Sequence, residues 1–448
     1  MKKVLVLGAG LVVRPLVRYL LDRGFGVTMA SRTVSKAQEV LENHPNGKAV
    51  AWTVENTAAL TSMVRDHDLT VSLLPAAYHI LAAKECLASR KPMVTTSYVS
   101  PAMRELDAAA RERGVLLLNE IGVDPGIDHM SAKKIMDEVE GERGKITSFK
   151  SYCGGLPAPE ANDNPFGYKF SWSPRGVLVA ATNNALYLKN GKKVNTPNAR
   201  LFKDFHILTV PGLGDFEAYP NRDSLSYIDV YHLKGIRTMY RGTLRNLGWC
   251  ETMQAVVKLG VLDQTRDDAL RGKRWRDLWV KVTDGAEPSR KGAAKRLRLK
   301  QSDPVLDRLE WLGLWSDDPL EGDVPAPIDF LSARMQRLMA YREGERDMLI
   351  LHHEFVAAYP GGKREAITSS MVDFGIAHGD SSMSRTVSLP AAIAVRLILE
   401  GKLRLTGVHI PVLKEIYAPV LSELATMNIV CMESRHPLPA RGQRPKKR

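Results

Sequence analysis

Two glycines behind an apolar stretch form the first pattern in the chain that suggests chemistry. GAGLVVRP follows the run Val4-Leu5-Val6-Leu7 directly, so Gly8 and Gly10 stand between an expected buried strand and an expected helix over 15–23. A dinucleotide pyrophosphate binds backbone N–H groups at a helix N-terminus and needs the tight turn and close approach that glycine allows. Val13 replaces the third glycine of G-x-G-x-x-G, which serves only close helix–strand packing. We predict that the cofactor-binding turn comprises Gly8, Gly10, Leu11 and Val12.

The residues after the second expected strand distinguish between the two nicotinamide dinucleotides. Enzymes that use NAD usually carry an Asp or Glu there, which bonds the ribose 2′-hydroxyl. This chain has Ser31, Arg32 and Thr33, with Lys36 one helical turn further on. Hydroxyl groups and a planar guanidinium suit a 2′-phosphate. The pattern predicts NADP(H); the alternative is that Arg32 is an ordinary solvated loop residue.

Further polar and small residues follow the next two expected strands. Leu74 and Pro75 stand at the end of the strand expected at 69–74, and Thr95-Thr96-Ser97-Tyr98 at the end of the strand expected at 92–95. The carboxyl ends of parallel strands line the ligand crevice of an open sheet. We therefore expect these residues to line the nicotinamide side of the cofactor.

The elements that must position these residues are read from periodicity. Over 1–125, short apolar strands alternate with helices of about ten residues, which is typical of βαβ units and a parallel sheet. Further strands are expected at 146–152, 185–188, 226–233 and 236–240, a hairpin at 348–359 and 365–375, and helices at 390–399 and 412–427. The predicted fold class is α/β: a Rossmann-type doubly wound parallel sheet plus a mixed α/β catalytic domain with a helical insertion domain. The predicted domains are 1–125 (dinucleotide binding, with 390–448 packing back on it), 126–245 with 346–389 (catalytic), and 246–345 (helical insertion).

Composition limits the class of protein. The 448 residues are 44% hydrophobic and 25% charged, and the net charge of +13 favours anionic partners. Four widely separated cysteines without a CxxC pair argue against a zinc site or a disulfide framework and favour a reducing, cytoplasmic compartment. We expect no membrane span, because no run of about 18 apolar residues is evident.

Much of the positive charge lies in 271–300 and in the tail from Arg441. We interpret these as a solvated helix face and a frayed terminus. Nucleic-acid binding is the alternative, but Trp275 and Trp279 lie at helical spacing and are expected in the core rather than on a stacking platform.

Four stretches combine glycine or proline with rare polar and aromatic residues, as functional loops do. Together they resemble saccharopine reductase, the NADP-dependent, L-glutamate-forming saccharopine dehydrogenase family, and the resemblance runs over essentially the whole chain, including HGDSSMSRTVSLPAAIA at 378–394. The four stretches are TTSYVSPAM (95–103), NEIGVDPGIDHM (119–130), SYCGGLPAPEANDNPFGYKFSWSPRG (151–176) and MYRGTLRNLGW (239–249).

The resemblance implies a reaction. NADP⁺ takes hydride from the carbon attached to a secondary amine, and water splits the imine into glutamate and 2-aminoadipate semialdehyde. The amine must first lose its proton, and water needs a base. The resemblance places Tyr98, Asp124 and Cys153 around the reacting centre, with His129 as a fourth candidate; which of them is the base stays open. Simpler interpretations are a turn or helix cap for Asp124, a buried small residue for Cys153, packing for Tyr98 and a structural role for His129.

The implied substrate carries three carboxylates, for which arginine is a natural bidentate ligand. Arg241 and Arg245 match the family's substrate-binding motif, and their spacing would let them share a helix face. Ser97, Asn164, Trp172 and Arg175 are expected to shape the substrate pocket. His352-His353-Glu354 does not form H-E-x-x-H, so we expect no metal site.

Two rivals stay open. A polyamine-type reductase, such as carboxynorspermidine dehydrogenase, shares the plan and the carbon–nitrogen chemistry, although its substrate would need acidic contacts. A redox sensor would bind NADP(H) without turnover. The family resemblance also implies a homodimer.

Overall fold

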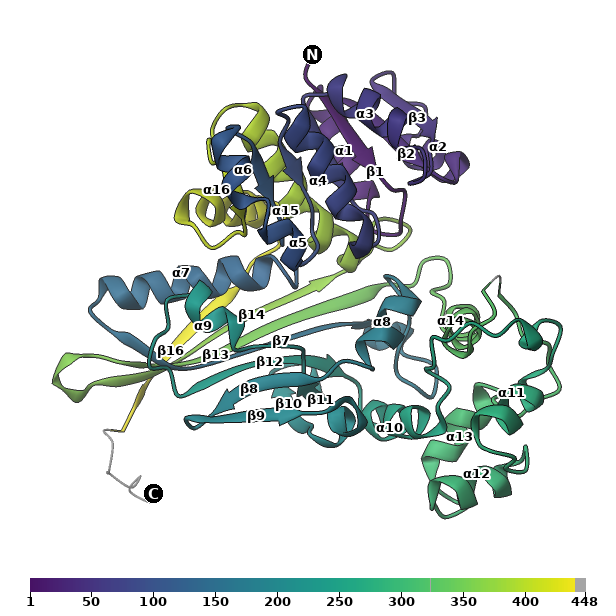
Figure 1. The fold of residues 1–448 in the computed structure, drawn as a ribbon. Coiled ribbons are helices and arrows are strands. Elements are labelled where there is room, and N and C mark those ends of the chain that lie inside the picture. Colours follow the sequence, from purple (N-terminus) through teal and green to yellow (C-terminus); the bar gives the residue numbers. More distant parts are fainter. Residues whose placement is uncertain (323, 440–448) are drawn as a thin grey trace. The chain divides into compact units, whose positions relative to one another are not determined.

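The computed structural model describes residues 1–322 and 324–439, so the basic tail from Arg441 lies outside the described residues. The chain divides into two compact units (Figure 1). The first comprises Met1–Lys145, Tyr359–Gly361 and Ser369–Ser434. Among the described residues, the second comprises Ile146–Ala358, Gly362–Thr368 and 435–439.

The first unit is built on a parallel sheet whose strand order is β15-β6-β5-β4-β1-β2-β3. Its central strands are apolar on both faces, because helices cover both sides of such a sheet. The strand order reverses between β1 and β4, where an open α/β sheet binds its ligand beyond the carboxyl ends of the strands. The Rossmann-type sheet is confirmed. The strands are β1 Lys3–Leu7, β2 Gly26–Ser31, β3 Gly47–Ala51, β4 Leu69–Ser72, β5 Met93–Val94, β6 Leu116–Leu118 and β15 Gly407–His409.

Most helices of this unit follow the predicted periodicity. The exception is 101–113, where the sequence pattern predicts a single helix. It is interrupted at Glu105 and Leu106, and α5 and α6 form in its place. The helices are α1 Arg14–Asp22, α2 Val34–Leu41, α3 Thr57–Arg65, α4 His79–Ala88, α5 Pro101–Arg104, α6 Asp107–Glu112, α7 Ile127–Gly141, α15 Ser382–Leu399 and α16 Lys414–Thr426.

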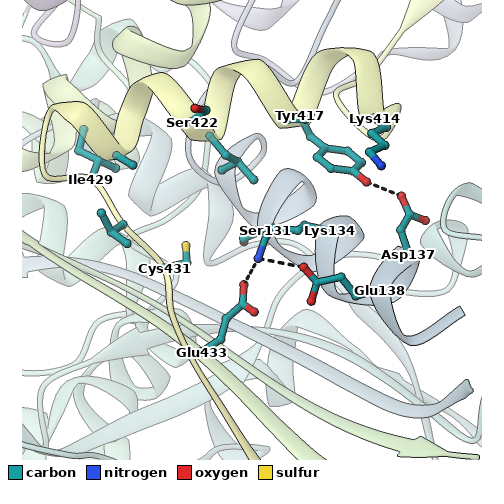
Figure 2. Close-up of a pocket in the computed structure, with 14 residues that line it drawn as sticks. Ser131, Lys134, Asp137, Glu138, Lys414, Tyr417, Ser422, Ile429, Cys431 and Glu433 are labelled. Atoms are coloured by element: carbon teal, nitrogen blue, oxygen red, sulfur yellow. Dashed lines mark hydrogen bonds and ion pairs between the residues drawn. The ribbon is translucent and has the colours of Figure 1, made fainter. Parts of the chain in front are cut away.

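A cavity of about 520 Å³ opens beside α7 and α16 (Figure 2). Lys134 on α7 forms ion pairs there with Glu433 at 2.8 Å and Glu138 at 3.1 Å. The Tyr417 hydroxyl of α16 donates to Asp137 at 2.6 Å. None of the residues predicted for cofactor or substrate lines this cavity.

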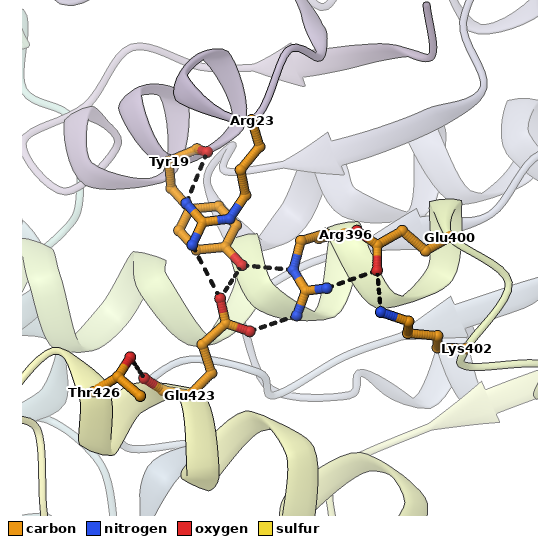
Figure 3. Close-up of polar contacts among 7 residues, drawn as sticks. All are labelled: Tyr19, Arg23, Arg396, Glu400, Lys402, Glu423 and Thr426. Atoms are coloured by element: carbon orange, nitrogen blue, oxygen red, sulfur yellow. Dashed lines mark hydrogen bonds and ion pairs between the residues drawn. The ribbon is translucent and has the colours of Figure 1, made fainter.

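Helix α15 packs on α1, and a polar network joins both helices to α16 (Figure 3). Tyr19 of α1 donates its hydroxyl to Glu423 of α16 at 2.5 Å, and Arg396 of α15 donates to both side chains. Arg23 lies over the Tyr19 ring and also pairs with Glu423. These contacts hold residues from both ends of the chain in one unit.

Helix α15 contains an apolar stretch of a length that the sequence analysis did not expect. Among the described residues it is long and apolar enough to cross a bilayer, but 72% of that window is buried inside the protein. Its length exceeds the predicted 390–399 because Ser381 caps an earlier start and Pro390 is accommodated within the helix. The burial marks α15 as a core helix.

The second unit contains a mixed sheet of order β10-β11-β12-β7-β13-β14-β16, in which β8 joins β12 and β9. The central pair β7 and β12 runs parallel, whereas β11 is antiparallel to β12. The hairpin predicted around the Pro-Gly-Gly turn is confirmed as β13 and β14. The strands are β7 Lys145–Pro157, β8 Ala185–Lys189, β9 Lys192–Thr196, β10 His206–Val210, β11 Gly214–Pro220, β12 Thr238–Arg245, β13 Asp347–Ala358, β14 Arg364–Phe374 and β16 Met432–Leu438.

The strand predicted at 226–233 is wrong, because helix α9 forms there. Asp223 accepts hydrogen bonds from the backbone N–H groups of Leu225 and Ser226, and such local bonds favour a turn over an extended strand. The helical character of 246–345 is confirmed. The helices of this unit are α8 Pro174–Ala180, α9 Ser226–Val230, α10 Trp249–Leu259, α11 Trp275–Val282, α12 Arg290–Leu297, α13 Pro304–Trp311 and α14 Pro327–Leu338.

The basic segment 271–300 spans α11 and α12. Trp275 and Trp279 are each 1% exposed, which confirms the prediction that they belong to the core. Several of the segment's cations form ion pairs, including Arg276 with Asp317 and Arg290 with Asp307.

Candidate active site

The glycine turn between β1 and α1 has the geometry that a pyrophosphate needs. Gly8 has φ +109°, and a Cβ there would lie 2.9 Å from the backbone oxygen of Leu73. Gly10 is exposed, and a Cβ at that position would have no described atom within 4 Å. Space is therefore open beside Gly10 and closed beside Gly8, as expected when a phosphate approaches the second glycine.

The N-terminus of α1 is free to bind an anion. Val13 occupies its N-cap position, and no described side chain caps the helix or places an acid in its first turn. Val13 is 1% exposed, so the side chain that replaces the third glycine packs into the core. Leu11 and Val12 lie on the turn itself, with Leu11 63% exposed. The first-turn N–H groups can therefore donate to phosphate oxygens.

Ser31, Arg32 and Thr33 join the end of β2 to α2. Arg32 and Thr33 are exposed, and the Ser31 hydroxyl accepts a bond from the Thr33 N–H at 3.3 Å. No described acid occupies the first turn of α2. A guanidinium and two hydroxyls are thus presented where an NAD enzyme would have a carboxylate.

On the other side of the strand-order reversal, a buried histidine connects the ends of β4 and β5. His79 bonds Ser72 through Nδ1 and Ser97 through Nε2, each at 2.8 Å. Leu74 and Pro75 lie between β4 and this histidine, and Pro75 is exposed. Sequence analysis missed His79, because nothing near it in the chain indicates that both serines bond it.

Tyr98 and Asp124 come together in the first unit. The Tyr98 hydroxyl donates to Asp124 Oδ1 at 3.1 Å. Asp124 precedes a cis-proline, and the loop is closed by a bond from the Gly122 N–H to the Pro125 carbonyl. A Cβ on Gly126 would lie 2.0 Å from the oxygen of Gly122, so this turn requires glycine.

A buried glutamate holds the strand-end loop that carries Tyr98. The Glu120 N–H donates to the Ser97 carbonyl, and Glu120 Oε1 accepts from the Val99 N–H at 3.0 Å. Its other oxygen lies 2.8 Å from His129 Nε2. His129 is fully buried on α7, in keeping with its structural interpretation. Glu120 was also missed, because only the fold brings it to the backbone of a distant loop and to His129.

In the second unit, Cys153 and the two arginines lie on adjacent strands. Cys153 on β7 is half-buried and is in register with Thr243 on β12. Arg241 and Arg245 lie on β12, so the expectation that they share a helix face is wrong. Residues four apart on a strand also point to one face, which preserves the pairing by a different geometry.

Arg245 is a buried cation without a described acidic partner. It is 5% exposed, stacks on Tyr168 and Trp249, and donates one bond to the Leu244 carbonyl. Its Nε has no hydrogen-bond partner among the described residues. Glu217, opposite it in register, instead accepts from the Gly248 and Cys250 N–H groups of α10. A buried charge of this kind is costly unless an anion neutralises it.

Arg241 lies close by on the same strand, buried and over the Tyr227 ring at 4.7 Å. The long loop supplies the other predicted residues. Asn164 bonds the Tyr168 carbonyl and the Phe166 N–H, so its amide holds the loop in shape. Trp172 packs against Gly176, and Arg175 pairs with Asp329 at 2.7 Å.

The described residues contain no group of three or more His, Cys, Asp or Glu side chains placed to hold a metal ion. The arrangement instead suits organic and anionic ligands: a phosphate-binding turn, a phenol–carboxylate pair, a thiol and buried guanidinium groups.

Comparison with protein families agrees with this chemistry. Residues 4–118 match the saccharopine dehydrogenase NADP binding domain, and residues 122–429 match the saccharopine dehydrogenase C-terminal domain. The chain belongs to the saccharopine dehydrogenase family. The predicted resemblance is therefore confirmed.

Curated relatives in the saccharopine dehydrogenase family match over nearly the full length. Saccharopine dehydrogenase [NADP(+), L-glutamate-forming] of Schizosaccharomyces pombe is 41% identical, covering 96% of this chain and 98% of that protein. The Saccharomyces cerevisiae protein of the same name is 39% identical, covering 94% and 96%. Mitochondrial alpha-aminoadipic semialdehyde synthase of Bos taurus is 36% identical, covering 96% of this chain and 47% of that protein.

A solved structure shares the fold. The apo histidine-tagged saccharopine dehydrogenase (L-Glu forming) from Saccharomyces cerevisiae superimposes with a TM-score of 0.86 at 37% identity, covering 97% of this chain and 100% of that one.

Proposed function

We propose that this chain is an NADP-dependent oxidoreductase that interconverts saccharopine with L-glutamate and 2-aminoadipate 6-semialdehyde. The observation that carries the proposal is the near full-length match to enzymes of that name, across both the cofactor-binding and the C-terminal parts. NADP(H) supplies the hydride chemistry when it is bound.

The residues of the first unit fit NADP(H). The α1 N-terminus and the space beside Gly10 would hold the pyrophosphate, and Ser31, Arg32 and Thr33 the 2′-phosphate. Leu74 and Pro75 would border the nicotinamide side. Each of these roles uses a group that the fold leaves accessible.

Proton handling falls to a phenol, a carboxylate and a thiol. The substrate nitrogen must lose a proton before hydride can leave its carbon, and a water must be deprotonated to split the imine. The Tyr98–Asp124 hydrogen bond brings a phenol and a carboxylate together. We propose Asp124, Cys153 and Tyr98 as the catalytic residues, with the general base being one of these three.

Carboxylate recognition falls to the arginines of β12. A substrate carboxylate would supply the acceptor that Arg245 Nε lacks within the described chain. We propose Arg241, Arg245 and Ser97 as direct contacts, with Asn164 and Trp172 shaping the pocket from the signature loop.

Absorbance at the nicotinamide band tests the proposal. Purified protein is mixed with saccharopine and NADP⁺, and with NAD⁺ in parallel, at mildly alkaline pH, and glutamate is measured. NADP⁺ reduction with glutamate release is expected. Protein that binds NADPH but reduces neither cofactor would overturn the assignment and lead to diamine-derived substrates, and turnover of those would favour the carboxynorspermidine-type alternative. Binding without turnover of either substrate class would leave the redox sensor.

We further propose a cytoplasmic homodimer and the division into three domains given above. The four cysteines without disulfides are compatible with a reducing compartment. Light scattering at micromolar concentration should give twice the chain mass; a monomer would contradict the dimer.

A further inference from the structure

The contact between His79 and Ser97 specifies more than a position, because a neutral imidazole has one N–H donor and one acceptor nitrogen. Both ring nitrogens are engaged, Nδ1 with Ser72 and Nε2 with Ser97, at 2.8 Å each. His79 is 4% exposed, and this burial lowers its pKa to about 4, so the ring is neutral at physiological pH. One serine must therefore donate to the ring and the other must accept from it.

Ser72 decides which serine donates. Its side chain is completely buried at the end of β4, and its hydroxyl has no hydrogen-bond partner other than His79 among the described residues. If Nδ1 carried the proton, the Ser72 O–H would be buried without an acceptor, at a cost of about 1–3 kcal/mol. The network therefore assigns Ser72 as the donor to Nδ1 and leaves the proton on Nε2.

The consequence appears at Ser97. Nε2–H donates to the Ser97 oxygen, so the hydroxyl proton of Ser97 is directed elsewhere. Ser97 is only half-buried, and it follows β5 at the carboxyl edge of the sheet, on the β4–β5 side of the strand-order reversal. This is the edge at which such sheets bind their ligands.

We propose that His79 is a positioning residue that fixes Ser97 as a hydrogen-bond donor to a ligand oxygen. The inference rests on the proposed function for the identity of the ligands. A substrate carboxylate and the carboxamide oxygen of the nicotinamide share the required chemistry, and the experiment distinguishes them.

Two substitutions at position 79 separate the roles of the two ring nitrogens. The amide of His79→Gln reaches close to the Nε2 position and can donate to Ser97, whereas the shorter amide of His79→Asn stays near the Nδ1 position beside Ser72. Ser97→Ala removes the donor itself. We expect Ser97→Ala and His79→Asn to weaken ligand binding by about 10- to 100-fold and His79→Gln to retain it within about 3-fold.

The readouts are KM and kcat for saccharopine and, independently of turnover, the Kd of NADPH by fluorescence titration. A rise in KM alone assigns the acceptor to the substrate carboxylate; a rise in the NADPH Kd assigns it to the cofactor. Equal behaviour of His79→Asn and His79→Gln, or unchanged KM and Kd in Ser97→Ala, overturns the proposal. If the wild-type protein does not turn over saccharopine, the proposed function is refuted, but the NADPH titrations still test the role of His79.

His67→Gln is the matched control. His67 is also buried and bonds Met63 and Thr28, but it precedes β4 at the opposite edge of the sheet. Its substitution should change thermal stability without changing KM or Kd.

A measurement on the wild-type protein covers the case in which His79→Asn does not fold. In ¹⁵N-histidine-labelled protein, two-bond ¹H–¹⁵N spectra identify the protonated ring nitrogen, and the His79 signals are those missing from His79→Gln. Protonated Nε2 is expected, and protonated Nδ1 would overturn the proposal.

Discussion

At the scale of single residues, Arg245 is unusual because its burial lowers the stability of the ligand-free protein. A buried guanidinium destabilises the fold when, as for Arg245 among the described residues, no acid pairs with it, and its contacts with the Tyr168 and Trp249 rings offset only part of that cost. The proposed contact with a substrate carboxylate would neutralise this charge. If the proposal holds, Arg245 strengthens substrate binding and weakens the stability of the free protein.

The substitution Arg245→Met tests this opposition. Met preserves much of the volume, so we expect the free energy of unfolding in urea to stay equal or rise, while KM for saccharopine rises about 10- to 100-fold. Arg334→Met is the control: Arg334 is equally buried and lies over Trp275, but pairs with Asp318. It should lose stability and keep its KM, and a reversal of the two patterns would contradict the assignment.

Cofactor choice is likewise a single-residue property. Arg32→Ala should lower kcat/KM for NADP⁺ by about 10- to 100-fold, because a charge-assisted bond to the 2′-phosphate is lost, and should change the value for NAD⁺ little. Arg65→Ala, at the exposed end of α3, is the control for lost positive charge. Equal losses with both cofactors would show that Arg32 does not contact the 2′-phosphate.

At the scale of elements, the two glycines of the turn between β1 and α1 are needed for different reasons. Gly8 is required by the backbone, since its φ is positive and Leu73 is close, whereas the space beside Gly10 is open. Gly10→Ala should therefore leave the melting temperature nearly unchanged while NADPH binding weakens, because the added methyl lies where the phosphates approach. Gly8→Ala should lower both, and a stable Gly8→Ala protein would contradict this account.

Elements also show how far sequence reasoning reached. The parallel strands were predictable because both faces are buried and their residues form apolar runs, as in Val4–Leu7. β3 was missed because its GKAVA sequence is only partly buried at the sheet edge. α9 was mistaken for a strand because its start depends on bonds from Asp223 rather than on periodicity.

The candidate site was predictable where a residue type carries the chemistry, and not where a distant contact does. Arg245 and Asp124 lie within the four stretches that the sequence analysis named. In the structure the Tyr98 hydroxyl donates a hydrogen bond to Asp124. His79 and Glu120 act through residues that only the folded sheet brings near them. Glu120 lies within the stretch 119–130 that the sequence analysis singled out, but neither sequence neighbourhood indicates which residues these side chains contact.

At the scale of the whole molecule, the network of Tyr19, Arg396 and Glu423 joins the two ends of the chain. Glu423→Gln should lower the free energy of unfolding by about 1–3 kcal/mol, because three donors lose a charged acceptor. Glu400→Gln removes only a more exposed partner of Arg396 and should cost about 0.5 kcal/mol or less. Equal losses of unfolding free energy in the two variants would show that Glu423 does not join the two ends of the chain.

Stability should also depend on pH at both extremes. Burial raises the pKa of Tyr19 to about 12 from its ordinary 10. The stabilisation of the folded state by its protonated hydroxyl is therefore complete below pH 10 and is lost as the pH rises to 12. The pKa of His79 falls from 6.5 to about 4, so its contribution, about 3 kcal/mol, is present above pH 6.5 and is lost as the pH falls to 4. Urea midpoints across pH 4–12 measure both, and Tyr19→Phe and His79→Gln should flatten the respective limbs.

The strand β15 sets an order on biosynthesis. It completes the cofactor-binding sheet beside β6, and α15 packs on α1, yet both elements are translated after residues 146–358 of the second unit. The edge of β6 and the apolar surface of α1 therefore stay exposed until the ribosome has made residues 382–409. An exposed strand edge invites aggregation, so nascent chains that stall before residue 407 should require chaperone protection that full-length chains do not.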